Sequence, residues 1–312
     1  MTALALLPTP LVDAPRLAEA LGLPSLLVKR DDLTGFAVAG NKARQLEGLL
    51  AEAAAVRADV IVTGGTPGSN FVQAAAAAAA YAGLRCVLVL AGPPVGLRSH
   101  PNLAAATGWG AEVRFTGEAD RGSVDRWLPQ VAAELSGQGA RPLVVPRGGA
   151  SATGAEGYRR AVDELLDQLG RQRPVVLVAA GAGGTLAGLV AGAVATGRTL
   201  QVVGASVSRP VDEVTARVLA LSRELAVRRG EPLPEPCDVR VVDARFAGHA
   251  VAAAEGAAAA AIALRTAGLV LDPVYTAKAL AVLPRVAAGR PALFWHTGGL
   301  LDAVAALMTG AT

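Results

Sequence analysis

Lys42 is the residue of this chain that most clearly suggests chemistry. Lysine and arginine together number 29, yet only Lys29, Lys42 and Lys278 are lysines. A lysine whose pKa is lowered by its surroundings can attack a carbonyl as a neutral amine, whereas arginine stays charged. Lys42 opens a helix-like run after Gly40-Asn41, where the positive end of a helix favours the neutral amine. The sequence therefore predicts a Schiff-base lysine at position 42.

The other two lysines suggest structural roles. Lys29 is followed by Arg30, Asp31 and Asp32, so we expect it to pair with a carboxylate. Lys278 lies within a helix-like run, and we expect it to be solvated there.

A glycine-rich turn offers a place for a phosphate. The apolar run VLVAA leads into Gly181-Ala182-Gly183-Gly184-Thr185, and a helical run follows. Such a turn presents several backbone N–H groups at a helix N-terminus, and Thr185 adds a hydroxyl. Leu186 occupies the place of the third glycine of a dinucleotide motif, and the chain lacks the Gly-Lys-Ser/Thr of a Walker loop here. A small phosphorylated ligand fits this pattern, and a plain tight turn is the alternative.

Three more strand-to-helix turns carry polar residues. They contain Ser69-Asn70 after TGGTPG, Tyr275-Thr276 after Asp272-Pro273, and Thr297 before Gly298-Gly299. Each pattern is also what ordinary helix capping looks like. In open α/β sheets, however, ligands bind at the carboxyl ends of the strands, where these turns would gather.

The elements that must position these turns alternate along the chain. Continuous apolar runs predict buried parallel strands, at Leu26–Lys29, Val60–Thr63, Cys86–Leu90, Glu112–Phe115, Leu143–Val145, Val175–Ala179, Val202–Ala205 and Ala292–Trp295. Alanine- and leucine-rich runs between them predict helices over 42–56, 70–82, 101–108, 123–136, 154–169, 185–196, 210–229, 250–267 and 275–288. This alternation is typical of an α/β fold with open, mostly parallel twisted sheets flanked by helices.

Two domains of ordinary size fit into 312 residues. The Gly-rich segment 145–154 and the segment 43–48 are the expected crossings between them. We therefore predict a larger domain from residues 1–44 and 151–312, and a smaller inserted α/β domain from residues 45–150.

Composition argues against several classes of protein. The net charge of +3 comes from scattered arginines with few aromatic residues, so we expect neither a nucleic-acid partner nor a membrane role. Cys86 and Cys237 suggest a reducing cytoplasm rather than a disulfide framework. His100, His249 and His296 have no ligand spacing, so no metal site is expected.

Taken together, the motifs resemble the pyridoxal-phosphate enzymes of fold type II, the tryptophan-synthase-β type. The similarity is greatest to the D-cysteine desulfhydrase / 1-aminocyclopropane-1-carboxylate (ACC) deaminase family. It rests on an ordered series over nearly the whole chain: LPTPL, VKRDDLTGFAVAGNKARQLEGLL, VTGGTPGSN, PRGGASATGAEGY, GAGGTLAGL, LDPVYTAK and HTGG.

The resemblance implies roles for the residues already singled out. Lys42 would hold pyridoxal 5′-phosphate as a Schiff base and move the proton of the substrate Cα. Asn70 would bind the ring hydroxyl and Thr297 the pyridine nitrogen. The phosphate would lie on Gly181, Ala182, Gly183, Gly184 and Thr185, while Ser69 and Tyr275 would act on the substrate. The family also implies a homodimer.

Several positions depart from the family pattern. Phe71-Val72-Gln73-Ala74 replaces the polar segment that follows Ser-Asn, and Ala182 replaces a threonine of the phosphate loop. Thr276 matches the desulfhydrases rather than the deaminases, which argues against ACC ring opening. Trp295 replaces a small residue, and Leu301-Asp302 replaces a proline-containing turn. Cofactor positions are kept, while substrate-side positions differ.

The sequence thus predicts a cytoplasmic pyridoxal-phosphate lyase or deaminase that acts on a small amino acid by α,β-elimination, as a D-cysteine desulfhydrase does. Two alternatives stay open. One is a β-replacement synthase of specialised metabolism, and the other is a cofactor-binding protein with altered catalysis. A nicotinamide oxidoreductase ranks below both.

Overall fold

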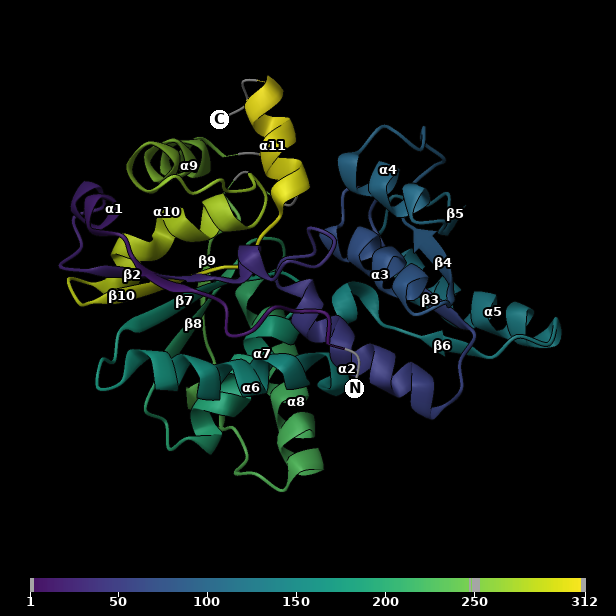
Figure 1. Ribbon diagram of the computed structural model, residues 1–312, viewed down its shortest axis with the longest axis horizontal. Coiled ribbons are helices and arrows are strands. Elements are labelled where there is room, and N and C mark those ends of the chain that lie inside the picture. The colour runs from purple at the N-terminus through teal and green to yellow at the C-terminus, as the bar shows by residue number, and fades with distance from the viewer. Residues whose placement is uncertain (1–2, 247, 249–252, 310–312) are drawn as a thin grey trace.

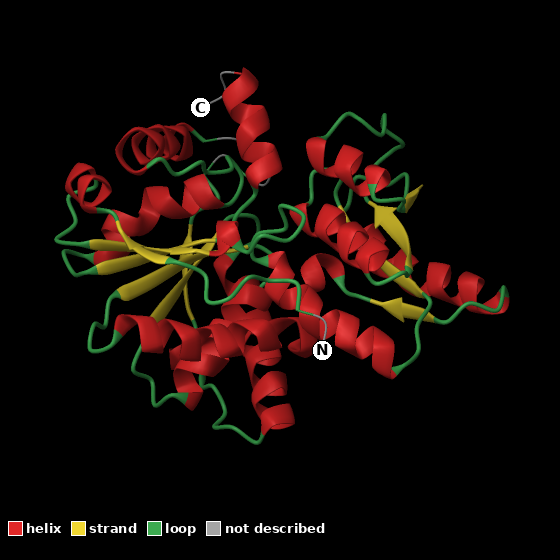
Figure 2. Ribbon diagram, viewed as in Figure 1, coloured by secondary structure: helices red, strands yellow, loops and turns green. Residues whose placement is uncertain are grey.

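The computed structural model describes residues 3–246, 248 and 253–309, and it contains two sheets that lie between layers of helices (Figures 1 and 2). The six-stranded sheet has the order β1-β2-β10-β7-β8-β9, in which β1 pairs antiparallel with β2 and the other pairs are parallel. The four-stranded sheet has the order β5-β4-β3-β6 and is parallel throughout. The predicted α/β class is confirmed.

The strands are β1 (Leu11–Asp13), β2 (Leu26–Arg30), β3 (Val60–Gly65), β4 (Arg85–Leu90), β5 (Glu112–Phe115), β6 (Pro142–Val144), β7 (Val175–Ala180), β8 (Gln201–Ser206), β9 (Arg240–Asp243) and β10 (Ala292–His296). The α-helices are α1 (Pro15–Ala20), α2 (Lys42–Ala55), α3 (Asn70–Tyr81), α4 (Pro101–Gly108), α5 (Gly122–Gly137), α6 (Ala152–Leu169), α7 (Gly184–Ala195), α8 (Val211–Arg229), α9 (Ala254–Ala267), α10 (Thr276–Ala287) and α11 (Leu300–Thr309). Short 3-10 turns cover Asp31–Leu33, Arg147–Gly149 and Pro236–Asp238.

All eight predicted strands are present, with ends that differ by one or two residues. The sequence did not predict β1, β9 or α1. Both strands lie at the edges of the large sheet, are only three and four residues long, and have no fully buried residue. Helix α1 has only six residues, too few for a clear helical periodicity. Of the predicted helix 250–267, residues 250–252 lie outside the described residues.

The large sheet has a separate hydrophobic core on each face. Helices α1, α9 and α10 cover one face, and α6, α7 and α8 cover the other, as the left half of Figure 1 shows. The small sheet is covered by α3 and α4 on one face and by α5 on the other. The carboxyl ends of the parallel strands in both sheets are the places where the glycine-rich turns begin.

Helix α2 links the two halves of the molecule. Its apolar residues Leu46, Leu49 and Leu50 belong to the core of the small sheet. Its opposite side packs closely on α6, since a Cβ added to Gly157 would lie 2.2 Å from the carbonyl oxygen of Arg44. Only a glycine permits this approach, so α2 is held against α6 as well as against the small sheet.

All four strands of the small sheet come from residues 60–144, within the segment expected to form the inserted domain. The boundaries at 44/45 and 150/151 stay a prediction. Among the described residues, no helix combines the length and the apolar character that crossing a bilayer requires.

Candidate active site

One pocket between the two sheets contains every residue that the sequence singled out for chemistry. Its lining includes Lys42, Ser69, Asn70, Gly181–Thr185, Tyr275 and Thr297. These residues come from the start of α2, the start of α3, the β7–α7 turn, the residue before α10 and the turn after β10. The pocket therefore lies at the carboxyl ends of the strands, as parallel α/β sheets favour.

Asn41 holds the beginning of α2 at the floor of this pocket. Its backbone N–H donates to the carbonyl oxygen of Thr297 at 2.9 Å, and its side-chain amide donates to the hydroxyl of Thr185 at 3.0 Å. The preceding Gly40 has a φ of +55°, and a Cβ there would lie 2.4 Å from the same carbonyl oxygen. Two turns of the pocket thus fix where Lys42 starts.

The Lys42 amine has no charged partner among the described residues, and burial lowers its pKa from 10.5 to about 8. Lys29 differs, because it forms an ion pair with Glu164, which confirms that it pairs with a carboxylate. Lys278 differs as well. It is fully buried and donates to the carbonyl oxygens of Arg245 and Gly248, so the prediction that it is solvated is wrong.

The β7–α7 turn forms a cradle that only glycines permit. Gly183 has a φ of +95°, in the left-handed region. A Cβ added to Gly181 would lie 2.9 Å from Cε1 of Tyr275, and one added to Gly184 would lie 2.9 Å from Nε2 of Gln45. The first N–H groups of a helix have no partner within the helix, so the start of α7 offers donors to an anion. The buried Oε1 of Gln45 is itself without a hydrogen-bond partner.

The Ser69 hydroxyl does not cap α3, although Ser69 occupies the N-cap position. The capping interpretation of this side chain is therefore wrong. Asn70 donates to the carbonyl oxygen of Ala39 at 3.2 Å and accepts from the amide of Gln73 at 3.1 Å. Gln73, which the sequence placed among the departures from the family, thus orients Asn70 from the next turn of the helix.

Asp272 shapes the opposite wall of the pocket. Its carboxylate accepts from the backbone N–H groups of Val274, Tyr275 and Thr276 and from the Thr276 hydroxyl at 2.6 Å. Tyr275 is the N-cap residue of α10 rather than part of its first turn. Burial raises the pKa of Tyr275 to about 12, and the phenol stays protonated at neutral pH.

Asp302 is a pocket residue whose importance the sequence did not indicate. It accepts from the Asn102 side chain at 2.9 Å, a contact between α11 and α4. Burial, with the nearby charge of Asp272, raises the pKa of Asp302 to about 6. Only the fold brings these two carboxylates, 30 residues apart in the chain, to the same pocket.

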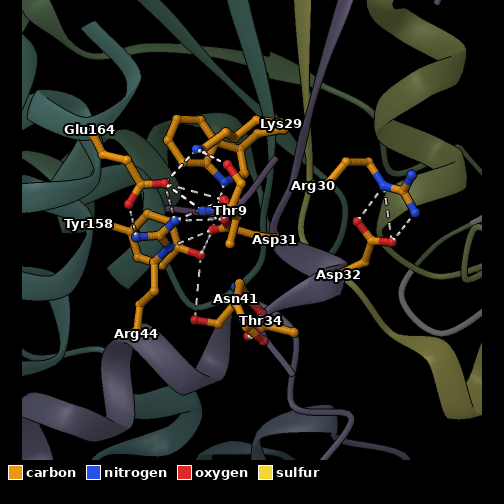
Figure 3. Close-up of polar contacts among 12 residues, drawn as sticks. Thr9, Lys29, Arg30, Asp31, Asp32, Thr34, Asn41, Arg44, Tyr158 and Glu164 are labelled. Atoms are coloured by element: carbon orange, nitrogen blue, oxygen red, sulfur yellow. Dashed lines mark hydrogen bonds and ion pairs between the residues drawn. The ribbon is translucent and has the colours of Figure 1, made fainter. Parts of the chain in front are cut away.

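A buried ionic cluster surrounds Asp31 (Figure 3). At its centre, the Asp31 carboxylate accepts from Nε of Arg44 at 3.0 Å, from the Tyr158 hydroxyl at 2.6 Å and from the Trp295 indole at 2.8 Å. Arg44 also contacts Glu164, which in turn binds Lys29. Trp295, one of the departures from the family pattern, therefore belongs to this cluster. The side chain is fully buried there and is absent from the pocket lining, so its assignment to the substrate side is wrong.

The charges in this cluster compensate one another. Burial alone would raise the pKa of Asp31, but the Arg44 guanidinium and the hydrogen bonds from Arg44, Tyr158 and Trp295 together hold it below the ordinary value of 3.8. A carboxylate with a lowered folded-state pKa stabilises the protein above its unfolded pKa, and this contribution is lost as the pH falls through the folded value. The cluster is therefore intact at neutral pH.

Comparisons with known proteins agree with this geometry. Residues 2–298 match the family model described as "Pyridoxal-phosphate dependent enzyme". The D-cysteine desulfhydrase of Klebsiella pneumoniae (strain 342) is 36% identical over 309 residues, which cover 94% of this chain and 92% of the relative. The D-cysteine desulfhydrase of Salmonella typhi is 36% identical over 305 residues, with the same coverage.

Solved structures show the same similarity. An ACC deaminase homologue superposes with a TM-score of 0.91 at 34% identity, over 98% of this chain and 94% of that one. A fungal L-serine ammonia-lyase from Rhizomucor miehei superposes with a TM-score of 0.67 at 18% identity, over 99% and 98% of the two chains. The second match shows the shared fold alone.

We expect Asp31→Asn to reduce the free energy of unfolding by about 3–5 kcal/mol, because two buried cations, Arg44 and Lys29, then share the single carboxylate of Glu164. Glu118→Gln is the control. It removes one partner of the half-exposed pair with Arg126 and should cost at most about 1 kcal/mol. Urea unfolding at pH 7 measures both, and a small loss for Asp31→Asn equal to that of the control would contradict the prediction.

Proposed function

The chain belongs to the family of pyridoxal-phosphate dependent enzymes, and on that premise we propose that it acts on a small amino acid by α,β-elimination with release of ammonia. The D-cysteine desulfhydrases and the ACC deaminase homologue that it resembles support this activity. The observation that carries the proposal is the unpartnered amine of Lys42, in one pocket with a glycine cradle suited to a phosphate.

The residues of the pocket fit pyridoxal 5′-phosphate, the cofactor of this family. A side chain at Gly181 or Gly184 would collide with Tyr275 or Gln45, so glycine keeps this wall of the pocket close, and the N-terminus of α7 lies in the same wall with its free N–H donors. Gln45 has a buried oxygen in the same pocket that still lacks a partner. Lys42 has a pKa low enough to supply a neutral amine near neutral pH.

We assign the cofactor contacts accordingly. Lys42 would hold the cofactor covalently, and the turn Gly181–Thr185 would bind its phosphate. Asn70, oriented by Gln73, would bind the ring hydroxyl. Thr297, held by the contact of its carbonyl with Asn41, would face the ring nitrogen. Each of these residues lines the pocket, which supports the assignment.

When bound, the cofactor withdraws electrons from the substrate Cα and so weakens its C–H bond. The Lys42 amine would accept the Cα proton, because it is unpaired and readily neutral. The Ser69 hydroxyl would contact the substrate, since it is not used to cap α3. Tyr275 would act as a hydrogen-bond donor, because its raised pKa keeps the phenol protonated.

We also place the protein in the cytoplasm as a homodimer. Both cysteines are free, and Cys237 is exposed, as a reducing compartment allows. One face of α11 exposes Leu300, Val304, Leu307 and Met308, spaced as residues on one side of a helix are. Cell fractionation tests the location.

We expect light scattering to give twice the mass of one chain, and Val304→Asp with Leu307→Asp to shift the protein to a monomer. Charged residues in an apolar interface are costly, which is the reason for the shift. Val227→Asp, at an exposed position on α8, is the control and should leave the mass unchanged. A wild-type protein with the mass of a single chain would contradict the dimer.

Borohydride reduction should fix the cofactor on the peptide that contains Lys42, and not on those with Lys29 or Lys278. Only the neutral amine reacts, so the rate at which apoprotein takes up the cofactor should rise with pH and level off above about 8. Peptide mass mapping and stopped-flow absorbance measure these outcomes. Lys42→Ala should lose the absorbance of the covalent complex. Unchanged absorbance in this variant would contradict the assignment.

A panel of D- and L-amino acids with leaving groups at Cβ should release a keto acid and ammonia from the wild-type enzyme. Turnover in Lys42→Ala should fall at least about 1,000-fold, because the Cα proton then has no acceptor. Activity that appears only after a nucleophile is added would instead favour β-replacement. A cofactor spectrum that no amino acid changes would indicate a protein that binds the cofactor without this catalysis.

A further inference from the structure

A second hollow lies beside the active-site pocket, and arginines line it. It shares part of its wall with the first pocket, namely Ser69, Gly148, Gly181, Ala182 and Tyr275. The rest of its lining includes Arg121, Arg147 and Arg209, which we call the arginine cluster. A ligand in the active site would therefore need only a short extension to reach three guanidinium groups.

The arginine cluster is assembled from distant segments of the chain. Arg121 immediately precedes α5, Arg147 begins the 3-10 turn Arg147–Gly149, and Arg209 lies between β8 and α8. A fourth arginine, Arg217 on α8, donates from Nε to the carbonyl oxygen of Ala182 at 2.8 Å. Both sheets thus contribute positive charge to one hollow between them.

The carboxylates near the arginine cluster do not balance its charge. Arg147 pairs with Asp125, and Arg209 pairs with Glu213, and both acidic side chains are about half exposed. Within the described part of the chain, neither Arg121 nor Arg217 forms an ion pair. The three arginines that line the hollow therefore have two carboxylate partners, and the nearby Arg217 adds positive charge, so the hollow has an excess of positive charge.

The excess positive charge in the hollow destabilises the charged form of the arginines themselves. Burial lowers the pKa of Arg121, and repulsion from Arg209 and Arg147 lowers it further against weaker attraction from Tyr275 and Glu213. Burial and the same two arginines lower the pKa of Arg217. Like charges that are partly removed from water are stabilised when an anion binds between them.

Because guanidinium groups bind the oxyanions of sulfates, phosphates and carboxylates in a planar, often bidentate geometry, we infer that the arginine cluster binds a second acidic group on the substrate. The enzyme would then prefer amino acids whose side chain ends in such a group, in addition to the α-carboxylate. This inference rests on the proposed function, and it names the substrate class.

The hollow is distinct from the places expected for the other anions. Gly181 and Ala182 line both spaces, but Gly183, Gly184 and Thr185, at the N-terminus of α7, line the active-site pocket and not the hollow. The start of α3, with Ser69 and Asn70, offers a helix N-terminus to the α-carboxylate. The arginine cluster remains for a third anionic group.

O-Phosphoserine and O-sulfoserine, as D and L forms, provide the test. In the reaction, the Cα proton is removed, the Cβ–O bond breaks, and phosphate or sulfate leaves with the bonding electron pair. The three-carbon remainder takes up one water and ends as pyruvate and ammonium. β-Chloroalanine follows the same course but has an uncharged side chain, so it reports on elimination without the second acidic group.

With the wild-type holoenzyme, we expect a higher kcat/KM for the acidic substrates than for β-chloroalanine, and a KM that rises with added KCl for the acidic substrates alone. Arg121→Gln should raise KM for the acidic substrates roughly 10- to 100-fold, because it removes a charge-assisted contact. Its KM for β-chloroalanine should change less than about twofold. Arg121→Lys should recover part of the loss.

Arg126→Gln is the matched control, since Arg126 lies on α5 five residues after Arg121, is exposed and pairs with Glu118 outside the hollow. It should leave KM unchanged for every substrate. If Arg121→Gln raised KM equally for acidic and neutral substrates, the inference would be overturned in favour of a role at the α-carboxylate. Reduced cofactor absorbance in that variant would overturn it in favour of the cofactor phosphate.

Failure of the inference can be distinguished from failure of the proposed function. Turnover of β-chloroalanine with no advantage for the acidic substrates overturns the inference alone. If none of the substrates is turned over and none changes the cofactor spectrum, both are contradicted. Preference for phosphate over sulfate, or the reverse, identifies which acidic group the arginine cluster binds best.

Discussion

The buried pair of Asp31 and Arg44 is the interaction on which the position of the active site depends. A carboxylate removed from water is stable only with a compensating charge and with its oxygens hydrogen-bonded. Arg44 provides that charge from α2, two residues beyond Lys42, while Tyr158 on α6 and Trp295 on β10 supply further donors. Three elements therefore meet at one carboxylate, and α2 cannot shift along its axis without exposing unpaired charge. The place of Lys42 follows from this constraint.

The carboxylates around α2 pair with Lys29 and Arg44 rather than with Lys42. Glu164 serves Lys29 and Arg44 together, and Asp31 serves Arg44, so the carboxylates near α2 are fully engaged. Lys42, two residues before Arg44, has no charged partner among the described residues, and burial acts on its pKa unopposed. Burial lowers the pKa of all three lysines, but Lys29 is paired with a carboxylate and Lys278 donates to carbonyl oxygens, whereas Lys42 has no such partner among the described residues.

Negative and positive side chains line different parts of the space around Tyr275. Besides burial, the charges of Asp272 and Asp302 raise the pKa of Tyr275, while Arg121 and Arg209, which line the neighbouring hollow, lower it. A substrate that enters this space meets hydrogen-bond acceptors near α10 and α11 and guanidinium groups near α5 and α8. Such a field orients a dipolar molecule before any contact is specific.

The sequence by itself determined the fold class and pointed to the residues that the structure gathers in one pocket. Buried strands appear as apolar runs, tight turns require glycine, and an isolated lysine at a helix start is visible in the residue types alone. These are local properties, set by neighbours in the chain. The same local view misjudged the Ser69 hydroxyl, the burial of Lys278 and the location of Trp295. Only the tertiary structure decided how charges are compensated, because the partners are distant in sequence: Trp295 reaches Asp31 across 264 residues, and the arginine cluster combines three separate segments. Pairing energies depend on distance and burial in space, which no local pattern records.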